Sequence, residues 1–381
     1  MQLLGILAFV IALLLSVMIH EFGHYLTAKH YGMKVSEFFL GFGARLWSKQ
    51  RGETEFGIKA IPAGGYCKIE GMTPGDQMPE GEEGRAFYKA SSGRKLIVLG
   101  AGSFLHFVLG YLLLFVLFAF VGTNQLLPTI SEVVKGSAAQ EAGLLAGDEV
   151  TAIDNKKVTS WYDDVQVIRN SQGKPLTLTI KRGADELQIT ASARPEVIDG
   201  EERYVLGIIN EVGLKRSNPI TAIKNSATVT KSFLVESAKS LIKLPSKIPA
   251  LWGQTVGGEK RDPNGLVGVV GVARVSGQAI GSDALSITER LSTFILIIAS
   301  LNIFVGLFNL LPILPLDGGH MAVAIADELR AFYARLRGRP RPAAIDVTLL
   351  TPITMVVFVI LAALTVLLLV ADIVNPVILN L

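Results

Sequence analysis

The chain has 381 residues, enough for about two domains, and half of them are hydrophobic. That share is high for a soluble globular protein, so the composition argues against an ordinary soluble enzyme. The net charge of only +3 implies no nucleic-acid partner, and the single cysteine, Cys67, excludes an intramolecular disulfide.

Four long apolar runs explain this composition; they begin near Leu3, Leu96, Leu291 and Thr351. Each run is long enough to cross a hydrocarbon layer of ~30 Å, and none contains Asp, Glu, Lys or Arg. The first run lacks the basic start and small-residue cleavage site of a signal peptide, so we interpret it as a membrane span.

Lysine and arginine are concentrated in two connections between these runs. The first-to-second connection contains Arg45, Lys49, Arg51, Lys59, Lys68, Arg85, Lys89, Arg94 and Lys95, and the third-to-fourth contains Arg330, Arg335, Arg337, Arg339 and Arg341. The positive-inside rule places both connections in the cytoplasm, and both termini and the long segment 122–289 outside.

The first apolar run ends in His20-Glu21-Phe22-Gly23-His24. A spacing of four residues places His20 and His24 on one helix face, as two imidazoles need in order to bind one metal ion. Glu21 stands beside them, where a carboxylate can act as general base toward an attacking water. Because unused charge is costly at membrane depth, we interpret the motif as an intramembrane zinc hydrolase site rather than a chance match.

Two further histidines need an interpretation. His30 falls at the third-ligand position of the metzincin pattern, but Thr27 stands where that pattern requires glycine. A continuing helix would carry His30 away from the metal, so we expect an interfacial histidine. His106, in the second apolar run, is interpreted as a hydrogen-bonded residue of the helix bundle, with a metal role as the alternative.

Gly41-Phe42-Gly43 opens a stretch with rough strand patterning. We predict strands at 54–60 and 66–70, joined by residues 61–65. A hairpin here would present an unpaired edge close to the active site, and that edge could take up a substrate segment as an additional strand. An ordinary cytoplasmic loop is the alternative.

The segment 122–289 begins as a small mixed domain. The pattern predicts strands at 129–134, 149–153, 176–182 and 186–191, and helices at 137–142 and 161–170. With A-G-L-x-x-G-D-x-V at 142–150 as its core, this part resembles one PDZ domain, expected at 122–195. PDZ domains take up peptide termini by strand addition; the alternative is a domain that only blocks access.

Apolar residues at helical spacing between 220 and 241, with interleaved lysines, predict a basic amphipathic helix. It would lie on the outer membrane surface or cap the PDZ domain. We expect Pro245 and Pro249 to end it. Residues 257–281 are rich in glycine and valine, and the pattern assigns them no structure.

The third apolar run contains Asn302 and Asn309 and leads into P-I-L-P-L-D-G-G-H at 312–320. Its two prolines must interrupt a helix, and irregular backbone at membrane depth is tolerated only where it is buried or lines a cavity. The first and third runs cross in the same direction, so their ends reach the same depth on the cytoplasmic side. Asp317 would therefore complete a site with His20 and His24 and leave a fourth position open for water. A helix cap at the interface is the alternative for Asp317.

Together these motifs resemble site-2 proteases, and most closely the bacterial regulator-of-sigma-E-type (RseP-like) intramembrane zinc metalloproteases. The resemblance implies Zn²⁺ held by His20, His24 and Asp317, with Glu21 as general base. It also implies a membrane-associated β element at 41–70 and a substrate-binding role for Asn309; Pro312, Gly41 and Gly43 are our further candidates for substrate contact.

Members of this family cut transmembrane anti-sigma factors or remnant signal peptides after a first external cleavage. The resemblance therefore implies regulated intramembrane proteolysis in a bacterial inner membrane, with membrane lipid as the other partner. Two departures concern substrate fit: Gly102-Ser103-Phe104-Leu105-His106 replaces the usual G-P-x-x-N, and Gly265-Leu266-Val267-Gly268 replaces G-P-V-G.

The expected fold is a mainly α membrane protein with four transmembrane helices, a membrane-associated β-hairpin and one external α+β PDZ domain. Its expected parts are 1–121, the PDZ domain at 122–195, an extension with the amphipathic helix at 196–289, and 290–381. A membrane PDZ receptor or adaptor with a structural metal site is the alternative function, but such a site has no need of Glu21. A metal transporter is disfavoured because the ionisable residues cluster at one depth.

Overall fold

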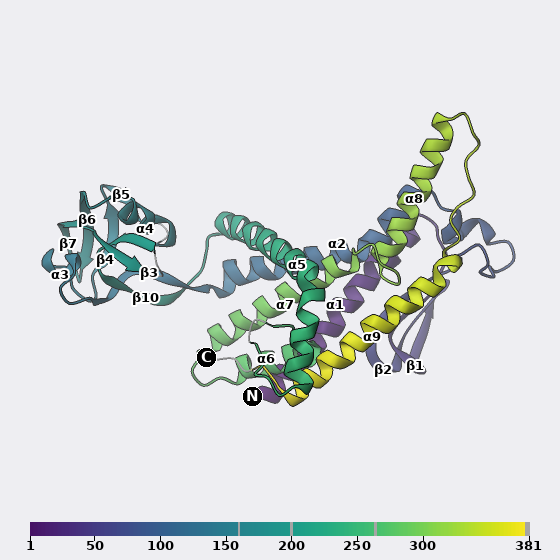
Figure 1. Cartoon of the computed structure of the whole chain (residues 1–381), viewed down its shortest axis with the longest axis horizontal. Helices are drawn as coiled ribbons and strands as arrows, with labels where there is room; N and C mark the ends of the chain where they lie inside the picture. Colours follow the sequence, from purple (N-terminus) through teal and green to yellow (C-terminus); the bar gives the residue numbers. More distant parts are fainter. Residues whose placement is uncertain (159–160, 199–200, 263–264, 378–381) are drawn as a thin grey trace. The chain divides into compact units, whose positions relative to one another are not determined.

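The computed structural model describes residues 1–158, 161–198, 201–262 and 265–377. The chain forms two compact units (Figure 1). The first combines Met1–Val121 with Ser217–Leu381, and the second is Gly122–Arg216. The last four residues of the predicted external tail and residues 263–264 of the unassigned stretch lie outside the described residues.

The first unit is mainly helical. Its helices are α1 (Gln2–His30), α2 (Ser92–Val116) with the π-helical turn η3 (Leu117–Val121), α5 (Pro219–Val256), α6 (Val269–Gly281), α7 (Ile287–Asn309), α8 (Asp317–Leu336) and α9 (Thr351–Val374), with 3₁₀ turns η1 (Glu83–Arg85), η2 (Phe87–Lys89) and η4 (Val347–Leu350). Among the described residues, four helices are long and apolar enough to cross a membrane: Gln2–His30, Ser92–Val121, Ile287–Asn309 and Val347–Val374. They correspond to the four apolar runs.

Glycines allow these helices to approach closely. A Cβ on Gly5 of α1 would lie 2.9 Å from the Cα of Gly277 in α6, and one on Gly110 of α2 would lie 2.8 Å from Ile303 of α7. Small residues at such crossings are typical of helices packed in a membrane, where close van der Waals contact replaces the hydrophobic effect. Figure 1 shows α1, α2 and α7 running together as the centre of this unit.

A long antiparallel hairpin joins α1 to α2. Its strands are β1 (Val35–Arg51) and β2 (Thr54–Ile69), and Gly52, at φ 60°, makes the turn between them. Residues 37–40 pair on one side with 65–68 and on the other with 55–58, so the hairpin folds back on itself. The bend falls at Gly41 and Gly43, whose φ values of 87° and 84° favour glycine.

The predicted connection at 61–65 is therefore wrong. Both predicted strands belong to β2, and they lie on opposite sides of β1 instead of pairing with each other. The turn is made at Gly52, while Gly64 and Gly65 lie within β2. A Cβ on Gly65 would lie 2.7 Å from the Sδ of Met18, so this part of β2 runs directly beside α1.

Ion pairs hold the turn of the hairpin. Arg85 donates two hydrogen bonds of 2.7 Å to the carboxylate of Glu53, and Lys29 at the end of α1 pairs with the same group. The Arg85 guanidinium lowers the pKa of Glu53 to about 2, from an ordinary value of 4.5. The fork geometry of arginine makes this a specific contact between the hairpin and the segment after it.

The second unit is built on a sheet in the order β10-β3-β4-β6-β7, with β5 beside β4 and a separate β8–β9 hairpin. Its elements are β3 (Thr123–Val133), α3 (Ala138–Glu141), β4 (Glu149–Ile153), β5 (Lys156–Lys157), α4 (Trp161–Arg169), β6 (Pro175–Arg182), β7 (Asp185–Ser192), β8 (Arg194–Ile198), β9 (Glu201–Val205) and β10 (Ile208–Lys215). The predicted strands and helices at 129–191 have counterparts here. Because β10 pairs with β3, the unit extends to Arg216, beyond the boundary at residue 195 expected from the sequence.

The prediction that Pro245 and Pro249 end the amphipathic helix is wrong. Helix α5 continues through both prolines to Val256, and it packs against α2, α7 and α9. A proline removes one hydrogen bond and bends a helix, but tertiary packing can keep the two parts continuous. Figure 1 shows that α5 changes direction along its length.

Candidate metal centre

Three donor atoms from α1 and α8 converge in the first unit. The Nε2 atoms of His20 and His24 are 3.0 Å apart, and the Oδ2 of Asp317 lies 3.1 Å from the first and 3.3 Å from the second. Both imidazoles are buried. Among the described residues, these three form the group of His, Cys, Asp and Glu side chains that could hold a metal ion.

The spacing of these atoms fits zinc. A tetrahedral Zn²⁺ with ligand bonds of 2.0–2.1 Å needs donor atoms separated by about 3.3 Å, close to the observed 3.0–3.3 Å. The Nδ1–H of His24 donates to the carbonyl oxygen of Val98 at 2.8 Å, which leaves Nε2 with a free lone pair. Two imidazoles and a carboxylate are also a donor set that zinc accepts.

Glycines bring α2 directly against the metal centre. A Cβ on Gly23 would lie 2.6 Å from the carbonyl oxygen of Ala101, and one on Gly102 would lie 2.5 Å from the ring of His20. Helix α2 can therefore cover His20 only because both positions lack a side chain. The motif at 102–106 contains Gly102, but a sequence pattern does not indicate which side chain packs against it.

A buried polar network joins three helices beside the centre. The Nδ1–H of His106 in α2 donates to the Oδ1 of Asn302 in α7 at 2.8 Å, and the Asn302 amide donates to the Oγ of Ser16 in α1 at 3.1 Å. The rings of His106 and His20 lie 5.0 Å apart. The prediction of His106 as a hydrogen-bonded bundle residue is thus confirmed. Ser16 was missed, because a lone serine in an apolar run gives no signal.

Asp317 is positioned by the break between α7 and α8. It is the first residue of α8, and two glycines follow it. A Cβ on Gly318 would lie 2.3 Å from the backbone of Leu310, and one on Gly319 would lie 2.5 Å from the backbone of Leu314. The Asp-Gly-Gly sequence therefore lets the connecting segment fold tightly against the first turn of α8.

Glu21 links the centre to the hairpin. Its carboxylate lies near the backbone N–H of Cys67 in β2, and it is close enough to His20, His24 and Asp317 to interact with their charges. The stretch 65–69 of β2 thus runs past the carboxylate of Glu21, the residue next to His20.

The other sequence-predicted residues have different positions. Gly41 and Gly43 form the bend of β1, Asn309 ends α7, and Pro312 is exposed in the segment between α7 and α8. His30 is exposed at the end of α1, where its ring lies 5.0 Å from that of Tyr31. His320 lies one turn after Asp317 in α8. None of these histidines belongs to the converging group among the described residues.

Comparison with known proteins gives consistent matches along the chain. The profile of Peptidase family M50 matches residues 8–361. Zinc metalloprotease Rip1 of Mycobacterium tuberculosis is 33% identical over 403 residues, covering 98% of each chain. The putative zinc metalloprotease RC0203 of Rickettsia conorii is 29% identical over 369 residues, covering 94% of this chain and 97% of that protein.

One solved structure matches a short part of the chain. It is the PDZ domain of an SdrC-like protein from Listeria innocua, 23% identical, covering 22% of this chain and 93% of that one. The TM-score of 0.20 is too low to establish the fold of the matched part.

Proposed function

Because this chain belongs to Peptidase family M50 and is an intramembrane zinc metalloprotease, we propose that His20, His24 and Asp317 are its zinc ligands. The observation that supports this assignment is the convergence of three donor atoms within 3.3 Å of one another from two separate helices. When bound there, zinc supplies a Lewis acid that polarises the scissile carbonyl and acidifies the attacking water.

Glu21 acts as the general base in this proposal. It takes a proton from the attacking water and returns it to the leaving amine, the usual division of labour for a carboxylate beside a metal. The backbone N–H of Cys67 lies beside its carboxylate. Glu21 is not among the three converging ligands, which leaves its oxygens available for proton transfer.

The substrate is bound as an extended strand. A transmembrane helix hides its carbonyl groups in hydrogen bonds, so it must unwind before hydrolysis. The stretch 65–69 of β2 pairs with β1 along one edge, and α1 lies against its face at Gly65. Among the described residues no strand pairs with its other edge, which suits strand addition next to Glu21. Gly41 and Gly43 shape this sheet, and Asn309 and Pro312 contact the substrate from the segment that precedes Asp317.

The proposed substrates are single-span proteins, such as anti-sigma factors or remnant signal peptides, that have lost their external part. The enzyme lies in the inner membrane of a bacterium, with both termini and the second unit outside and the zinc site toward the cytoplasm, as the lysine and arginine distribution requires. All five histidines belong to the first unit. The second unit therefore supplies no metal-binding histidine. It serves instead as a PDZ-like size filter that excludes untrimmed substrates. Peptide capture in its groove is the rival role.

Metal analysis and turnover of purified variants test the site. His20→Ala and His24→Ala should lose zinc and activity together, whereas Glu21→Gln should keep zinc and lose turnover of a single-span substrate. Asp317→Ala should weaken zinc binding, and His30→Ala is the matched control that should stay active. Appreciable cleavage by Glu21→Gln would contradict the mechanism. Zinc loss in His30→Ala would mean that His30 belongs to the metal site and that the site is misassigned.

A further inference from the structure

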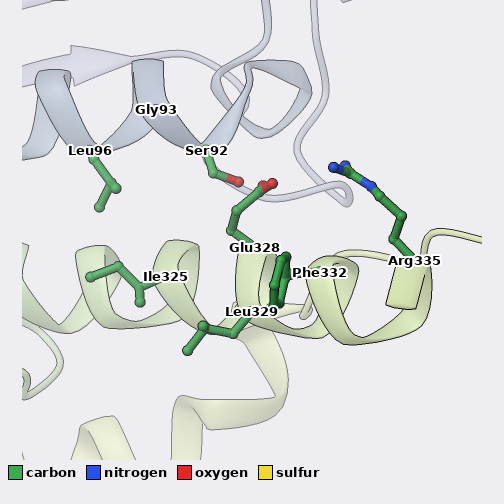
Figure 2. Close-up of a pocket in the computed structure, with 8 residues that line it drawn as sticks. All are labelled: Ser92, Gly93, Leu96, Ile325, Glu328, Leu329, Phe332 and Arg335. Atoms are coloured by element: carbon green, nitrogen blue, oxygen red, sulfur yellow. The ribbon is translucent and has the colours of Figure 1, made fainter. Parts of the chain in front are cut away.

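A cleft of about 570 Å³ lies between the first turns of α2 and the distal half of α8 (Figure 2). Its walls are Ser92, Gly93, Leu96, Ile325, Glu328, Leu329, Phe332 and Arg335. This volume is within the usual range for small-molecule sites. No residue of the metal centre lines the cleft, so it needs an explanation of its own.

The two ends of the cleft differ in polarity. Figure 2 shows Leu96 and Ile325 together at one end, Glu328 extending toward Ser92 in the middle, and Arg335 at the other end. The apolar end is nearer to the start of α8, where Asp317 joins the metal centre, and the polar end is farther along that helix. The cleft is thus amphipathic along its length.

The cleft continues into an exposed apolar stripe on α8. Ile325, Leu329, Phe332, Tyr333 and Leu336 are 45%, 52%, 50%, 57% and 67% exposed. Their spacing of three and four residues places them on one face of the helix. An apolar surface of this extent indicates contact with lipid or with another protein.

The opposite face of α8 is covered by the chain that follows it. Arg330 donates to the carbonyl oxygen of Ala343 at 3.3 Å, the backbone N–H of Ile345 donates to Asp327 at 2.8 Å, and Ala331 is buried. The returning segment therefore packs behind the helix and leaves the stripe uncovered.

The charges around the cleft favour an anion. Glu328 is neutralised by Arg341 at 3.0 Å. Within the described part of the chain, Arg335, Arg337 and Arg339 form no ion pair. Anionic lipid headgroups attract basic residues next to a membrane span.

We propose that one anionic phospholipid of the surrounding bilayer binds in this cleft. Its phosphate lies at the Arg335 end, and an acyl chain lies along Leu96, Ile325 and Leu329. The polarity of the cleft matches the two parts of such a lipid, and the arginine without an ion pair supplies the countercharge. The proposal does not depend on the peptidase chemistry; it needs only that the first unit lies in a membrane.

The test measures binding of phosphatidylglycerol and phosphatidylcholine to the purified full-length chain in detergent, by titration with native mass spectrometry. Arg335→Gln should weaken phosphatidylglycerol binding about fivefold, as expected for one basic residue near a lipid headgroup. Arg339→Gln removes the same charge outside the cleft and should change binding little.

A second variant fills the cleft without changing charge. A Cβ on Gly93 meets no atom within 4 Å, so Gly93→Leu fits the helix and occupies the space of the acyl chain. It should abolish retention of the lipid while the thermal unfolding midpoint stays at or above that of the parent.

Two results would overturn the proposal. Equal binding of the anionic and zwitterionic lipids would remove the role of Arg335. Equal weakening by Arg335→Gln and Arg339→Gln, with no effect of Gly93→Leu, would mean that the basic segment attracts lipid generally and that no defined site exists.

Discussion

At the scale of single residues, the metal centre depends on positions that have no side chain. Gly102 allows the ring of His20 to lie against α2, and Gly318 and Gly319 allow Asp317 to reach the same point. Ligand residues can be found from a motif, but the space that they need is provided by glycines beside them in the sequence or on a neighbouring helix.

Gly102→Ala should displace His20 and weaken zinc binding, because the new Cβ would lie 2.5 Å from the imidazole. Gly100→Ala is the matched control on the same helix, where the nearest atom to the new Cβ is the end of Met321 at 3.7 Å. Zinc content after dialysis against a graded series of chelator concentrations measures the difference. Equal zinc affinity in the two variants would mean that α2 moves away at no cost.

His106→Leu should destabilise the first unit by about 1–3 kcal/mol, because it leaves the buried Oδ1 of Asn302 without its hydrogen-bond donor. Phe104→Ala, at a 63% exposed position of the same helix, is the control and should change stability much less. Thermal unfolding in a fixed detergent compares the two variants. A His106→Leu variant as stable as the parent would indicate that Asn302 finds another partner.

At the scale of elements, the hairpin must be held in a fixed place if its strand at 65–69 is to bind substrate beside Glu21. The ion pairs of Glu53 with Arg85 and Lys29 hold its turn to the end of α1 and to the segment after β2. These contacts connect residues far apart in sequence, so they fix the sheet relative to the first helix.

Glu53→Gln should loosen the hairpin and increase hydrogen exchange of β1 and β2 at neutral pH, while Glu80→Gln at an exposed position should not. The pH dependence has a defined sign. The folded-state pKa of Glu53 is lowered to about 2, so its stabilising contribution is present above its ordinary pKa of 4.5 and is lost as the pH falls toward 2. The difference in unfolding midpoint between parent and Glu53→Gln should therefore shrink over that interval; a constant difference would rule out the ion pair as its cause.

At the scale of the whole molecule, the second unit is inserted into the first through adjacent ends. Thr123 pairs with Lys215, and the backbone N–H of Ser217 donates to the carbonyl of Phe118 at 2.8 Å. The insertion can therefore be removed between Val121 and Ser217 without leaving an unpaired strand.

Replacing Gly122–Arg216 by a short glycine-serine linker should let the enzyme cut untrimmed substrates, with little change in cleavage of trimmed ones. Gel analysis of both substrates, with zinc content as the check on folding, gives the answer. Loss of trimmed-substrate cleavage in a variant that still binds zinc would favour peptide capture over size exclusion.

Cysteine labelling tests the orientation that the proposed function requires. In a Cys67→Ser background, a cysteine at position 49 or 337 should react only from the cytoplasmic side, and one at position 186 only from outside, because lysine and arginine are retained inside. External labelling at position 337 would remove the argument that α1 and α8 meet at the cytoplasmic side.

The sequence alone determined the features that follow from local chemistry. Residues without charge over twenty positions predict membrane helices wherever they occur, and a four-residue spacing of histidines places them on one face of any helix. The convergence of His20 and His24 with Asp317 was also predicted, on the argument that two spans with the same predicted crossing direction bring their motifs to one depth. The strands of the second unit were also readable, since alternation and turn residues are local.

Only the tertiary structure decided what depends on distant contacts. The hairpin was mispredicted because β1 pairs with two parts of β2, and no local pattern records which strand is the partner. Helix α5 continues through its prolines because neighbouring helices hold it, and the unit at 122–216 is longer than expected because β10 returns to pair with β3. Gly102, Ser16 and the cleft beside Gly93 acquire their roles in the same way: each depends on which helix packs against it, and packing is a property of the whole chain.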